Sequence, residues 1–493
     1  MPYWYSLLFA AWMMSGVEVP EGTLLHIRLT TPVGSFASHP GSRVEAVLIA
    51  PVKIGGTTVV APGSAVSGAV KTVRRVGLGL VHETASLKVE FDSISTPGGT
   101  ATPLPARVIA VENGREEVSP SGSIREVRST SSLGNRAAHF IRSAVLIDTH
   151  AQLAVWAADS LLLQMPEPEI FLPAGAELTL ALTSPMRVAP VDPSQQPLDP
   201  PGFSEEERAG LDPMVSALPF RTQGAGSRPS DPVNLLLVGS RSEVAEAFKA
   251  AGWTEALPKT VRSRLSVIAA VVRGEAFANA PMAPLRLNDE LADMSWEKGF
   301  NNFAKRHHIR LWKQGETADG QEIWAAAATH DMEYAYLRRG GGLATHQVAR
   351  QLDRERDKVA DDLVFTGCVD TAGQWDRPEF PRVMKGATGD ILETDGRLAV
   401  LRLHRCDAEE LAQLFAPTLP VHGGTWQMVL RREILSFRSD MIRHNWYWRG
   451  YEGARYLVAA IRHKPASEPE VAPAETRVSR LQPDWLTTIV SLR

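Results

Sequence analysis

Apolar and polar residues alternate along residues 19–32, which read VPEGTLLHIRLTTP. Leu25, Ile27 and Leu29 are the apolar positions, and polar residues separate them. A period of two after a Pro-x-Gly turn predicts a β-strand with one buried face. The same pattern returns in residues 172–185, LPAGAELTLALTSP. We expect the second copy to pair near the first and to remove an exposed edge of the sheet.

Similar short alternating segments fill the chain between the two copies. Gly55-Gly56 lies between two such segments and predicts a tight hairpin. Residues 85–96 and 103–114 continue the series. Short strands with regular turn signals predict an all-β barrel or sandwich. Residues 135–164 lack glycine and have apolar residues at helical spacing, so they predict one or two accessory helices.

Proline and small polar residues dominate residues 189–230. Such a composition buries little apolar surface, so it predicts a semi-stiff linker, with one short helix at residues 204–218. The chain is therefore expected to be multidomain, and we expect the domains on either side of the linker to fold independently. The predicted divisions are a signal peptide at 1–16, a β-barrel-like domain at 17–188, the linker, an α+β domain at 231–465 and a tail at 466–493.

The hydrophobic pattern changes after the linker. A buried strand and an amphipathic helix come first, then two strands, a long helix and a further strand, at residues 231–240, 241–253, 306–312, 321–331, 345–367 and 396–405. The order β-α-β-β-α-β is typical of the ferredoxin-like fold, in which two helices cover one face of four antiparallel strands. We therefore predict an α+β domain of this kind with additions, including a further strand and helix after residue 424.

Five ordered motifs in this region, DPVNLLLVGS, RHHIRLW, AAATHD, LDRERDKVADDL and NWYWRGYEGAR, resemble the LssY C-terminal domain family, which is named after a putative component of type I secretion. The resemblance covers residues 231–464 and implies an association with the cell envelope or with secretion. In other members the domain follows a phosphatase-like membrane domain, which we do not find here, so the resemblance implies no reaction. The turn-and-strand pattern of the first domain resembles, more weakly, the β-domain of core-channel proteins of type IV secretion and conjugation.

Composition narrows the class of protein. The chain has 493 residues and a formal net charge of −4, so no overall field attracts nucleic acid or acidic lipid. The first 16 residues, MPYWYSLLFAAWMMSG, are apolar and then small, which predicts a cleaved export signal, although no Lys or Arg precedes the apolar run. A retained short anchor is the alternative. We expect no membrane-spanning helix in the mature chain, because no other apolar run is long and uncharged enough.

Two cysteines are present, Cys368 and Cys406. They exclude a disulfide-rich scaffold and a cysteine-built zinc site, and they allow at most one disulfide bond. The sequence leaves open whether the two residues pair. An exported, periplasmic or envelope-associated location is expected from the signal segment.

The motif RHHIRLW contains the first candidate chemistry. If Ile309 and Leu311 face the helices, then His308, Arg310 and Trp312 project together from the opposite face. Neighbouring strands would add histidine and arginine to this face, which we expect to be open to solvent. Such a face would suit an anionic small ligand, although a solvated face without function is the alternative. The ligand-binding candidates are His308, Arg310, Trp312, His330, Asp331, Arg402 and His404, with Trp324 replacing His330 in another register.

A divalent metal site is a second interpretation of the same region. Imidazole and carboxylate ligands of this kind suit zinc or manganese, but the spacing matches no standard metal motif. The candidate ligands are His308, His330, Asp331, His346 and Asp353, with Glu355 or Asp357 as alternative carboxylates.

The long predicted helix contains two charged residues in its apolar stripe. Glu355 and Arg356 interrupt this stripe, which runs through Val348, Leu352, Val359 and Leu363. A buried charge is costly unless it is paired, so we expect ion pairs here, with Arg310 or Arg431 as partners of the glutamate.

Taken together, the export signal, the family resemblance and the domain pattern favour an envelope protein that acts in binding or assembly with secretion-apparatus proteins. The alternative is a metal-assisted hydrolase.

Overall fold

The computed structural model describes residues 16–78, 84–96, 99–112, 116–126, 169–189, 199–257, 282–299, 306–336, 344–386, 389, 391–406 and 409–414, with a few residues between 426 and 454. Residues Met1–Arg438 belong to one compact unit, and Ser439–Arg493 to a second. The predicted signal segment before residue 16, the accessory helices at 135–164, the motif NWYWRGYEGAR except for Ala454, and the tail lie outside the described residues.

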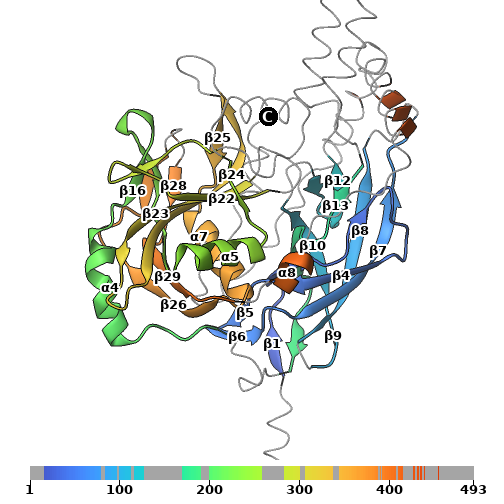
Figure 1. Ribbon diagram of the computed structural model, residues 1–493. Coiled ribbons are helices and arrows are strands. Elements are labelled where there is room, and N and C mark those ends of the chain that lie inside the picture. Colours follow the sequence, from blue (N-terminus) through green and yellow to red (C-terminus); the bar gives the residue numbers. More distant parts are fainter. Residues whose placement is uncertain are drawn as a thin grey trace, which may run out of the picture. The chain divides into compact units, whose positions relative to one another are not determined.

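The first part of the chain forms a barrel-like antiparallel sheet of nine strands (Figure 1). The strand order is β10-β14-β2-β4-β7-β8-β12-β11, and β9 pairs with β8. The bounds are β2 (Leu24–Leu29), β4 (Arg43–Leu48), β7 (Ala65–Arg74), β8 (Ser86–Ser95), β9 (Thr102–Pro103), β10 (Ala106–Val111), β11 (Glu116–Val118), β12 (Ser123–Glu126) and β14 (Glu177–Leu182). Strand pairs beside it are β1 (Val17–Val19) with β15 (Met186–Val188), β3 (Val33–Gly34) with β13 (Phe171–Leu172), and β5 (Val52–Ile54) with β6 (Thr57–Val60).

The two copies of the repeated sequence pattern form neighbouring strands. β2 and β14 pair antiparallel, with Ile27 opposite Leu178 and Leu25 opposite Leu180. All four side chains are buried in the core of this sheet. β14 also pairs with β10 on its other side, so it lies inside the sheet and not at its edge. The expected pairing of the two copies is confirmed.

The predicted glycine hairpin is also present. Gly55 and Gly56 join β5 to β6 with φ values of 59° and 85°. Both values lie in the left-handed region that a type I′ turn requires at its two central residues, and glycine adopts it without steric cost.

The second part of the chain contains an eight-stranded mixed sheet. Its order is β19-β22-β23-β24-β18-β29-β26, and β25 pairs with β24. Among the described pairs of this sheet, that of β18 and β29 is parallel and the others are antiparallel. The bounds are β18 (Leu235–Val238), β19 (Thr254–Glu255), β22 (Met294–Lys298), β23 (Arg306–Glu316), β24 (Glu322–Tyr336), β25 (Ala344–Val348), β26 (Val369–Asp376) and β29 (Arg397–Leu403). A smaller sheet of four strands contains β16 (Arg221–Gln223), β17 (Pro229–Pro232), β20 (Arg286–Leu287) and β21 (Glu290–Leu291). A two-stranded sheet contains β27 (Val383–Lys385) and β28 (Ile391–Glu393).

Helices α5 (Arg241–Ala250) and α7 (Leu352–Phe365) lie over one face of the eight-stranded sheet (Figure 1). Phe248 of α5 and Val359 of α7 pack there against alternate residues of the strands, such as Ile309 and Leu311. The expectation that these two strand residues face the helices is confirmed.

The opposite face of the sheet is covered as well, which differs from the open face that we expected. Helix α4 (Glu205–Ala217) places Leu211 and Val215 in a core with Trp312 and Val400. This helix is the one predicted within the proline-rich segment, and Ser204 caps it through a capping box with Glu207. The sequence pattern could not reveal this cover, because α4 precedes the domain and its apolar stripe is short. Two shorter helices are η2 (Ala225–Ser227) and α8 (Glu409–Leu414).

The long helix predicted at 345–367 is shorter in the structure. Residues Ala344–Val348 form β25 and extend the pairing of β24, and α7 begins at Leu352. Helix α5 begins at Arg241 as predicted, and Ser240 caps it, with Glu243 completing the capping box. Gly252 follows this helix with a φ of 82°, as a helix-ending glycine should.

Cys368 and Cys406 form a disulfide bond. It connects the segment after α7 to the segment after β29. Within the described residues, none of the helices is both long and apolar enough to cross a membrane.

Candidate functional site

Two histidines from neighbouring strands meet at one end of the helix-covered face. His307 of β23 lies directly opposite His330 of β24, and their rings stack with centroids 4.0 Å apart. His307 shares its face with Ile309 and Leu311, because side chains two residues apart in a strand point the same way. Its side chain is only 5% exposed. His307 is therefore part of the interior beneath α7, and His330 beside it is half-buried.

Carboxylates lie on both sides of the His307 ring. Nδ1 is 2.7 Å from Oε2 of Glu355 in α7, and Nε2 is 3.6 Å from Oε2 of Glu112, which directly follows β10. Glu112, His307 and His330 each bring a ligand-type atom within 4.8 Å of the other two. Burial alone would lower the pKa of His307, but the Glu355 and Glu112 carboxylates outweigh it and raise this pKa to about 9.

His308 and Arg310 lie on the other face of the sheet and are buried, with exposed fractions of 6% and 5%. His308 Nε2 is 2.7 Å from the hydroxyl oxygen of Thr329. Arg310 donates a hydrogen bond of 2.9 Å to Asp231 in β17. The expectation of a solvated face is thus corrected: β17 and neighbouring segments cover these residues. Their binding of an anionic ligand stays a prediction.

Trp312 lies further along β23 and is buried against α4, with its Nε1 donating to the carbonyl oxygen of Glu290. Arg402 of β29 forms an ion pair with Glu207 of α4. His404 follows β29, with Nδ1 2.9 Å from the carbonyl oxygen of Arg405. These residues do not gather around His308.

The strand register explains this separation. Arg402 lies opposite Val238, Val238 opposite Ile323, and Ile323 opposite Gly315. Gly315 is seven residues from His308 along β23. At about 3.3 Å per residue, Arg402 and His308 are therefore aligned roughly 20 Å apart along the strands. A ligand that contacted both would have to be long.

The residues predicted as metal ligands are also divided. His330 lies on the face of α7, whereas His308 lies on the opposite face, 3.5 Å from the Asp331 carboxylate. Asp353 in α7 accepts hydrogen bonds from the Thr394 hydroxyl and the Asp395 amide. The backbone of His346 is in β25, and its side chain lies outside the described part of the structure.

Glu355 and Arg356, the two charges in the apolar stripe of α7, are both buried and both paired. The partner of Glu355 is His307. We expected Arg310 or Arg431, but the carboxylate contacts of those arginines are to Asp231 and Glu169. Arg356 forms ion pairs of its own with three aspartates, Asp353, Asp357 and Asp395. Both charges thus have partners in the structure, and the partner shown for Glu355 is a histidine where we expected an arginine.

A second buried group of charges, the five-charge cluster, connects the barrel-like sheet to the second sheet. Its members are Arg28 of β2, Glu177 of β14, Lys298 of β22, and Lys358 and Asp362 of α7. The two carboxylates accept from all three cations at distances between 2.5 and 3.3 Å. This cluster joins two regions that we expected to fold independently.

The cations control the ionisation of the cluster. Burial would raise the pKa of Glu177, but Lys298, Lys358 and Arg28 lower it well below its ordinary value. The same cations lower the pKa of Asp362 against the effect of burial. Both carboxylates are therefore ionised at neutral pH, and Trp253 adds a hydrogen bond of 3.1 Å from its Nε1 to Asp362.

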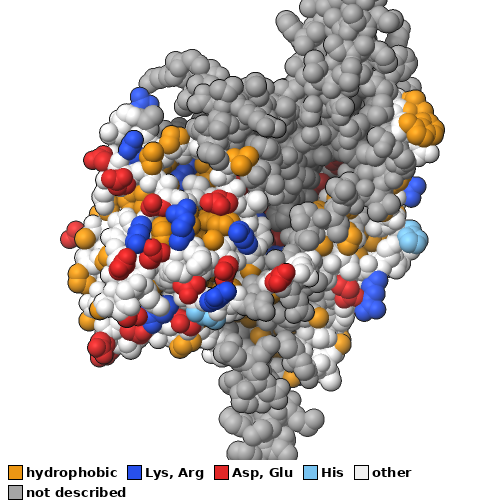
Figure 2. Space-filling view, viewed as in Figure 1, with side chains coloured by type: hydrophobic (Ala, Val, Ile, Leu, Met, Phe, Trp, Pro, Cys, Tyr) orange, Lys and Arg blue, Asp and Glu red, His pale blue; other side chains and the backbone are white. Residues whose placement is uncertain are grey.

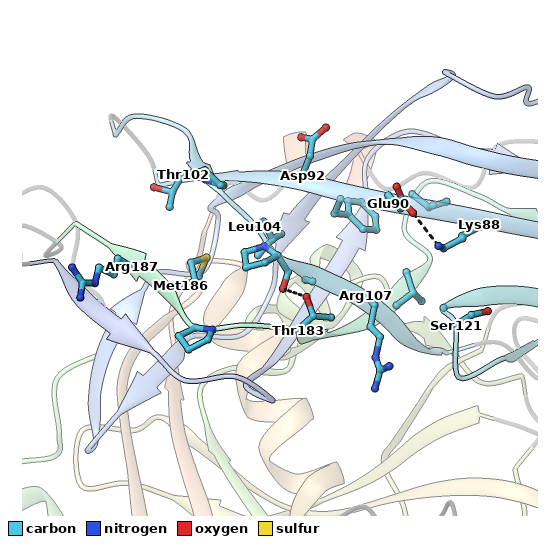
Figure 3. Close-up of a pocket in the computed structure, with 18 residues that line it drawn as sticks. Lys88, Glu90, Asp92, Thr102, Leu104, Arg107, Ser121, Thr183, Met186 and Arg187 are labelled. Atoms are coloured by element: carbon cyan, nitrogen blue, oxygen red, sulfur yellow. Dashed lines mark hydrogen bonds and ion pairs between the residues drawn. The ribbon is translucent and has the colours of Figure 1, made fainter. Parts of the chain in front are cut away.

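A hollow on the barrel-like sheet is a further candidate. It lies beside β8, β9, β10 and β15 and has a volume of about 670 Å³. Leu104 and Met186 line it, and Figure 3 shows the charged groups of Asp92 and Arg107 pointing in opposite directions. Lys88 pairs with Glu90 at its rim. Because its charged groups do not converge, the hollow lacks the arrangement of a polar ligand site.

The distribution of charged side chains on the surface agrees with the nearly balanced numbers of acidic and basic residues in the sequence. On the face shown in Figure 2, basic and acidic side chains are interspersed among the described residues. No nucleic-acid partner was expected from the net charge, and that expectation stays a prediction.

The sequence did not identify His307 or Glu112 as candidate residues. A signal for His307 was present, because it occupies a core-facing position in β23 while Glu355 interrupts the apolar stripe of α7. Two polar breaks in facing apolar patterns indicate a polar contact inside a core. Glu112 could not be found in this way, because 195 residues separate it from His307.

The family match falls on the second part of the chain. Residues 214–398 match the family described as LssY C-terminus. The predicted resemblance is confirmed within residues 214–398. The matched residues run from the end of α4 to the start of β29 and include the eight-stranded sheet except for most of β29. The LssY C-terminus match also includes His307, His330 and Glu355, whereas Arg28, Glu112 and Glu177 lie outside it.

A solved structure also matches, that of ComB10 of the Com Type IV secretion system of Helicobacter pylori. It is 10% identical, covers 35% of this chain and 90% of its own, and has a TM-score of 0.20. A likeness at this TM-score supports no conclusion about fold or function. No curated protein matches the chain.

Proposed function

We propose that this chain is an exported envelope protein in which an LssY-like domain is joined to a barrel-like sheet and serves in binding or assembly associated with secretion. The proposal that the chain is exported rests on the disulfide bond between Cys368 and Cys406. Disulfides persist in oxidising compartments and are rare in the cytosol. The apolar segment at residues 1–16 supports the same location.

A binding or assembly role is supported by how the polar residues are used. The candidate residues of the second sheet are engaged with one another, as in the pairs Arg310–Asp231, Arg402–Glu207 and Glu355–His307. Buried charges that are paired in this way maintain a structure. We do not propose the metal-assisted hydrolase, because His308 and Asp331, two of the residues on which it depended, lie on the opposite face of the sheet from His330.

The proposed domain is ferredoxin-like at its centre. The order β23-β24-β18-β29, with α5 and α7 on one face, supports this assignment, whereas the parallel pairing of β18 with β29 departs from the four antiparallel strands of that fold. β22 and β26 extend the sheet at its two sides, and α4 covers the second face.

Export is tested with the full chain carrying a C-terminal tag in bacterial cells. Cells are fractionated, proteins are denatured, and free thiols are labelled with a maleimide polymer before and after reduction. We expect the protein in the envelope or periplasmic fraction, shortened at its N-terminus, and labelled only after reduction. A Cys368→Ser/Cys406→Ser double variant gives the unlabelled reference. Full-length protein in the cytosolic fraction with both thiols labelled without reduction would contradict the proposal.

A further inference from the structure

Nε2 of His307 is a buried nitrogen without a hydrogen-bond partner among the described residues. The Glu112 oxygen nearest to it is 3.6 Å away, which is too long for a hydrogen bond. A buried polar atom left in this way costs free energy, so its presence requires a reason. The ring of His330 stacks on this ring, so a second imidazole lies beside the nitrogen.

We propose that Glu112, His307 and His330 bind one divalent transition-metal ion, with Zn²⁺ as the fitting ion. The three side chains present two imidazoles and one carboxylate, which is a ligand set that zinc accepts. They are the group of three potential ligands that the described residues bring within 4.8 Å of one another. The proposal goes beyond the proposed function and does not depend on export or on secretion.

The spacing of the ligand atoms agrees with tetrahedral coordination. With zinc–ligand bonds of about 2.0–2.1 Å, two ligands of a tetrahedral zinc ion are about 3.4 Å apart. The 3.6 Å between Nε2 of His307 and Oε2 of Glu112 is close to this value. The rings of His307 and His330 stack with an inclination of 25°, and a ring nitrogen of His330 lies within 4.8 Å of the other two ligand atoms.

Glu355 prepares His307 for this role. Its Oε2 lies 2.7 Å from Nδ1, and a carboxylate there accepts the Nδ1 proton. The ion takes the place of the proton at Nε2, which is released on binding, and the lone pair of Nε2 then points toward Glu112. A carboxylate that orients a histidine ligand in this way is a common feature of zinc sites. Glu355 is therefore a positioning residue and not a ligand.

The positive charge of Lys358 lies near the proposed metal site, but ion pairs with two carboxylates reduce its repulsion of a bound metal ion. Lys358 is the nearby basic group that acts on His307, and it is paired with Glu177 at 2.5 Å and with Asp362 at 3.3 Å. Three protein ligands leave a fourth position for water or another donor. The bound ion would link the segment after β10 to β23 and β24, and so connect the two sheets at a second place besides the five-charge cluster.

The test uses the purified full chain after treatment with a chelator. Zn²⁺ binding is measured by titration calorimetry and by elemental analysis, and Co²⁺ serves as a spectroscopic probe of tetrahedral geometry. We expect one ion per chain. Glu112→Gln and His330→Ala should each weaken binding by more than about 100-fold, and Glu355→Gln by about 10–100-fold, as for other groups that orient a ligand. His39→Ala, at an exposed histidine, should bind like the parent.

Circular dichroism of each metal-free variant shows whether it is folded. Glu112→Gln is the decisive variant because Glu112 is 27% exposed and its replacement conserves size. Failure of the parent to bind Zn²⁺, or binding by folded Glu112→Gln with the affinity of the parent, would overturn the proposal. In that case the group would hold a proton, shared among His307, Glu112 and Glu355, and not a metal ion.

Discussion

Two clusters of buried charged groups lie where the barrel-like sheet and the second sheet approach each other, and they differ in how their charges are paired. In the five-charge cluster, Glu177 and Asp362 accept from three cations at short distances. In the histidine group, one nitrogen of His307 has no hydrogen-bond partner in the part of the chain that the structure describes. Two carboxylates that each accept from three cations indicate a structural joint, whereas a buried imidazole nitrogen beside two further potential ligands indicates a site that can bind an ion.

The largest effect is expected from breaking the five-charge cluster. Asp362→Ala removes one of two carboxylates and leaves Arg28, Lys298 and Lys358 buried with Glu177 alone. Breaking a buried ion pair by removing one partner costs about 3–5 kcal/mol. Urea denaturation of the full chain should show this loss in the free energy of unfolding. A loss below about 1 kcal/mol, the range of an exposed pair, would mean that the cluster does not hold the sheets together.

A smaller effect is expected from Glu355→Gln in the absence of metal. The change weakens a buried hydrogen bond to His307 but keeps the size of the side chain. Such a change costs about 1–3 kcal/mol. The same denaturation assay measures it, and an effect equal to that of Asp362→Ala would remove the distinction between the two groups.

Two neighbouring residues of α7 give a test by pH. Asp362 has a lowered pKa, whereas burial, with Asp357 and Asp362 nearby, raises the pKa of Asp361 to about 7. Between about pH 4 and 7 the folded state then holds a proton at Asp361 that the unfolded state has lost. The free energy of unfolding should therefore fall as the pH rises through this window.

Asp361→Asn removes this dependence and should raise stability at pH 7 and above by about 1–2 kcal/mol. Thermal unfolding from about pH 4 to about pH 8 compares the variant with the parent across the window in which the group titrates. An unchanged pH profile in Asp361→Asn would show that another group titrates in this window.

The smallest effect is expected at an exposed ion pair. Arg397 and Asp376 are 2.9 Å apart, with side chains 52% and 75% exposed. Exposed pairs contribute about 0–1 kcal/mol. Asp376→Asn should therefore leave the free energy of unfolding nearly unchanged and serve as the control for Asp362→Ala. A large loss in the free energy of unfolding would show that exposure to solvent does not determine how much an ion pair of this protein contributes.

Local patterns predicted the parts of the fold that depend on local chemistry. Alternation in β2 and β14 identified two strands, and their matching sequences identified them as partners. The alternation of β23 also placed Ile309 correctly against the helices. It could not reveal that α4 buries Trp312 and that β17 covers Arg310, because α4 and the start of β17 lie in the earlier segment that we predicted to be a linker.

The candidate site was predicted in part. His330 was among the proposed metal ligands, and Glu355 was recognised as a buried charge that needs a partner. The pairing of His307 with His330 depends on the register of the hairpin between β23 and β24, which contains a bulge near Lys313. A bulge shifts the register by one residue, and side-chain alternation alone does not locate it.

The pairing of β2 with β14 also determines when the first sheet can be completed during synthesis. Arg28 and its partner Glu177 are 149 residues apart in the chain. β2 therefore emerges long before the strand that covers its edge, and it must remain unpaired on that side during the interval. Such late closure makes folding slow and exposes a strand to aggregation, so a chaperone that shields this edge should increase the yield of folded protein.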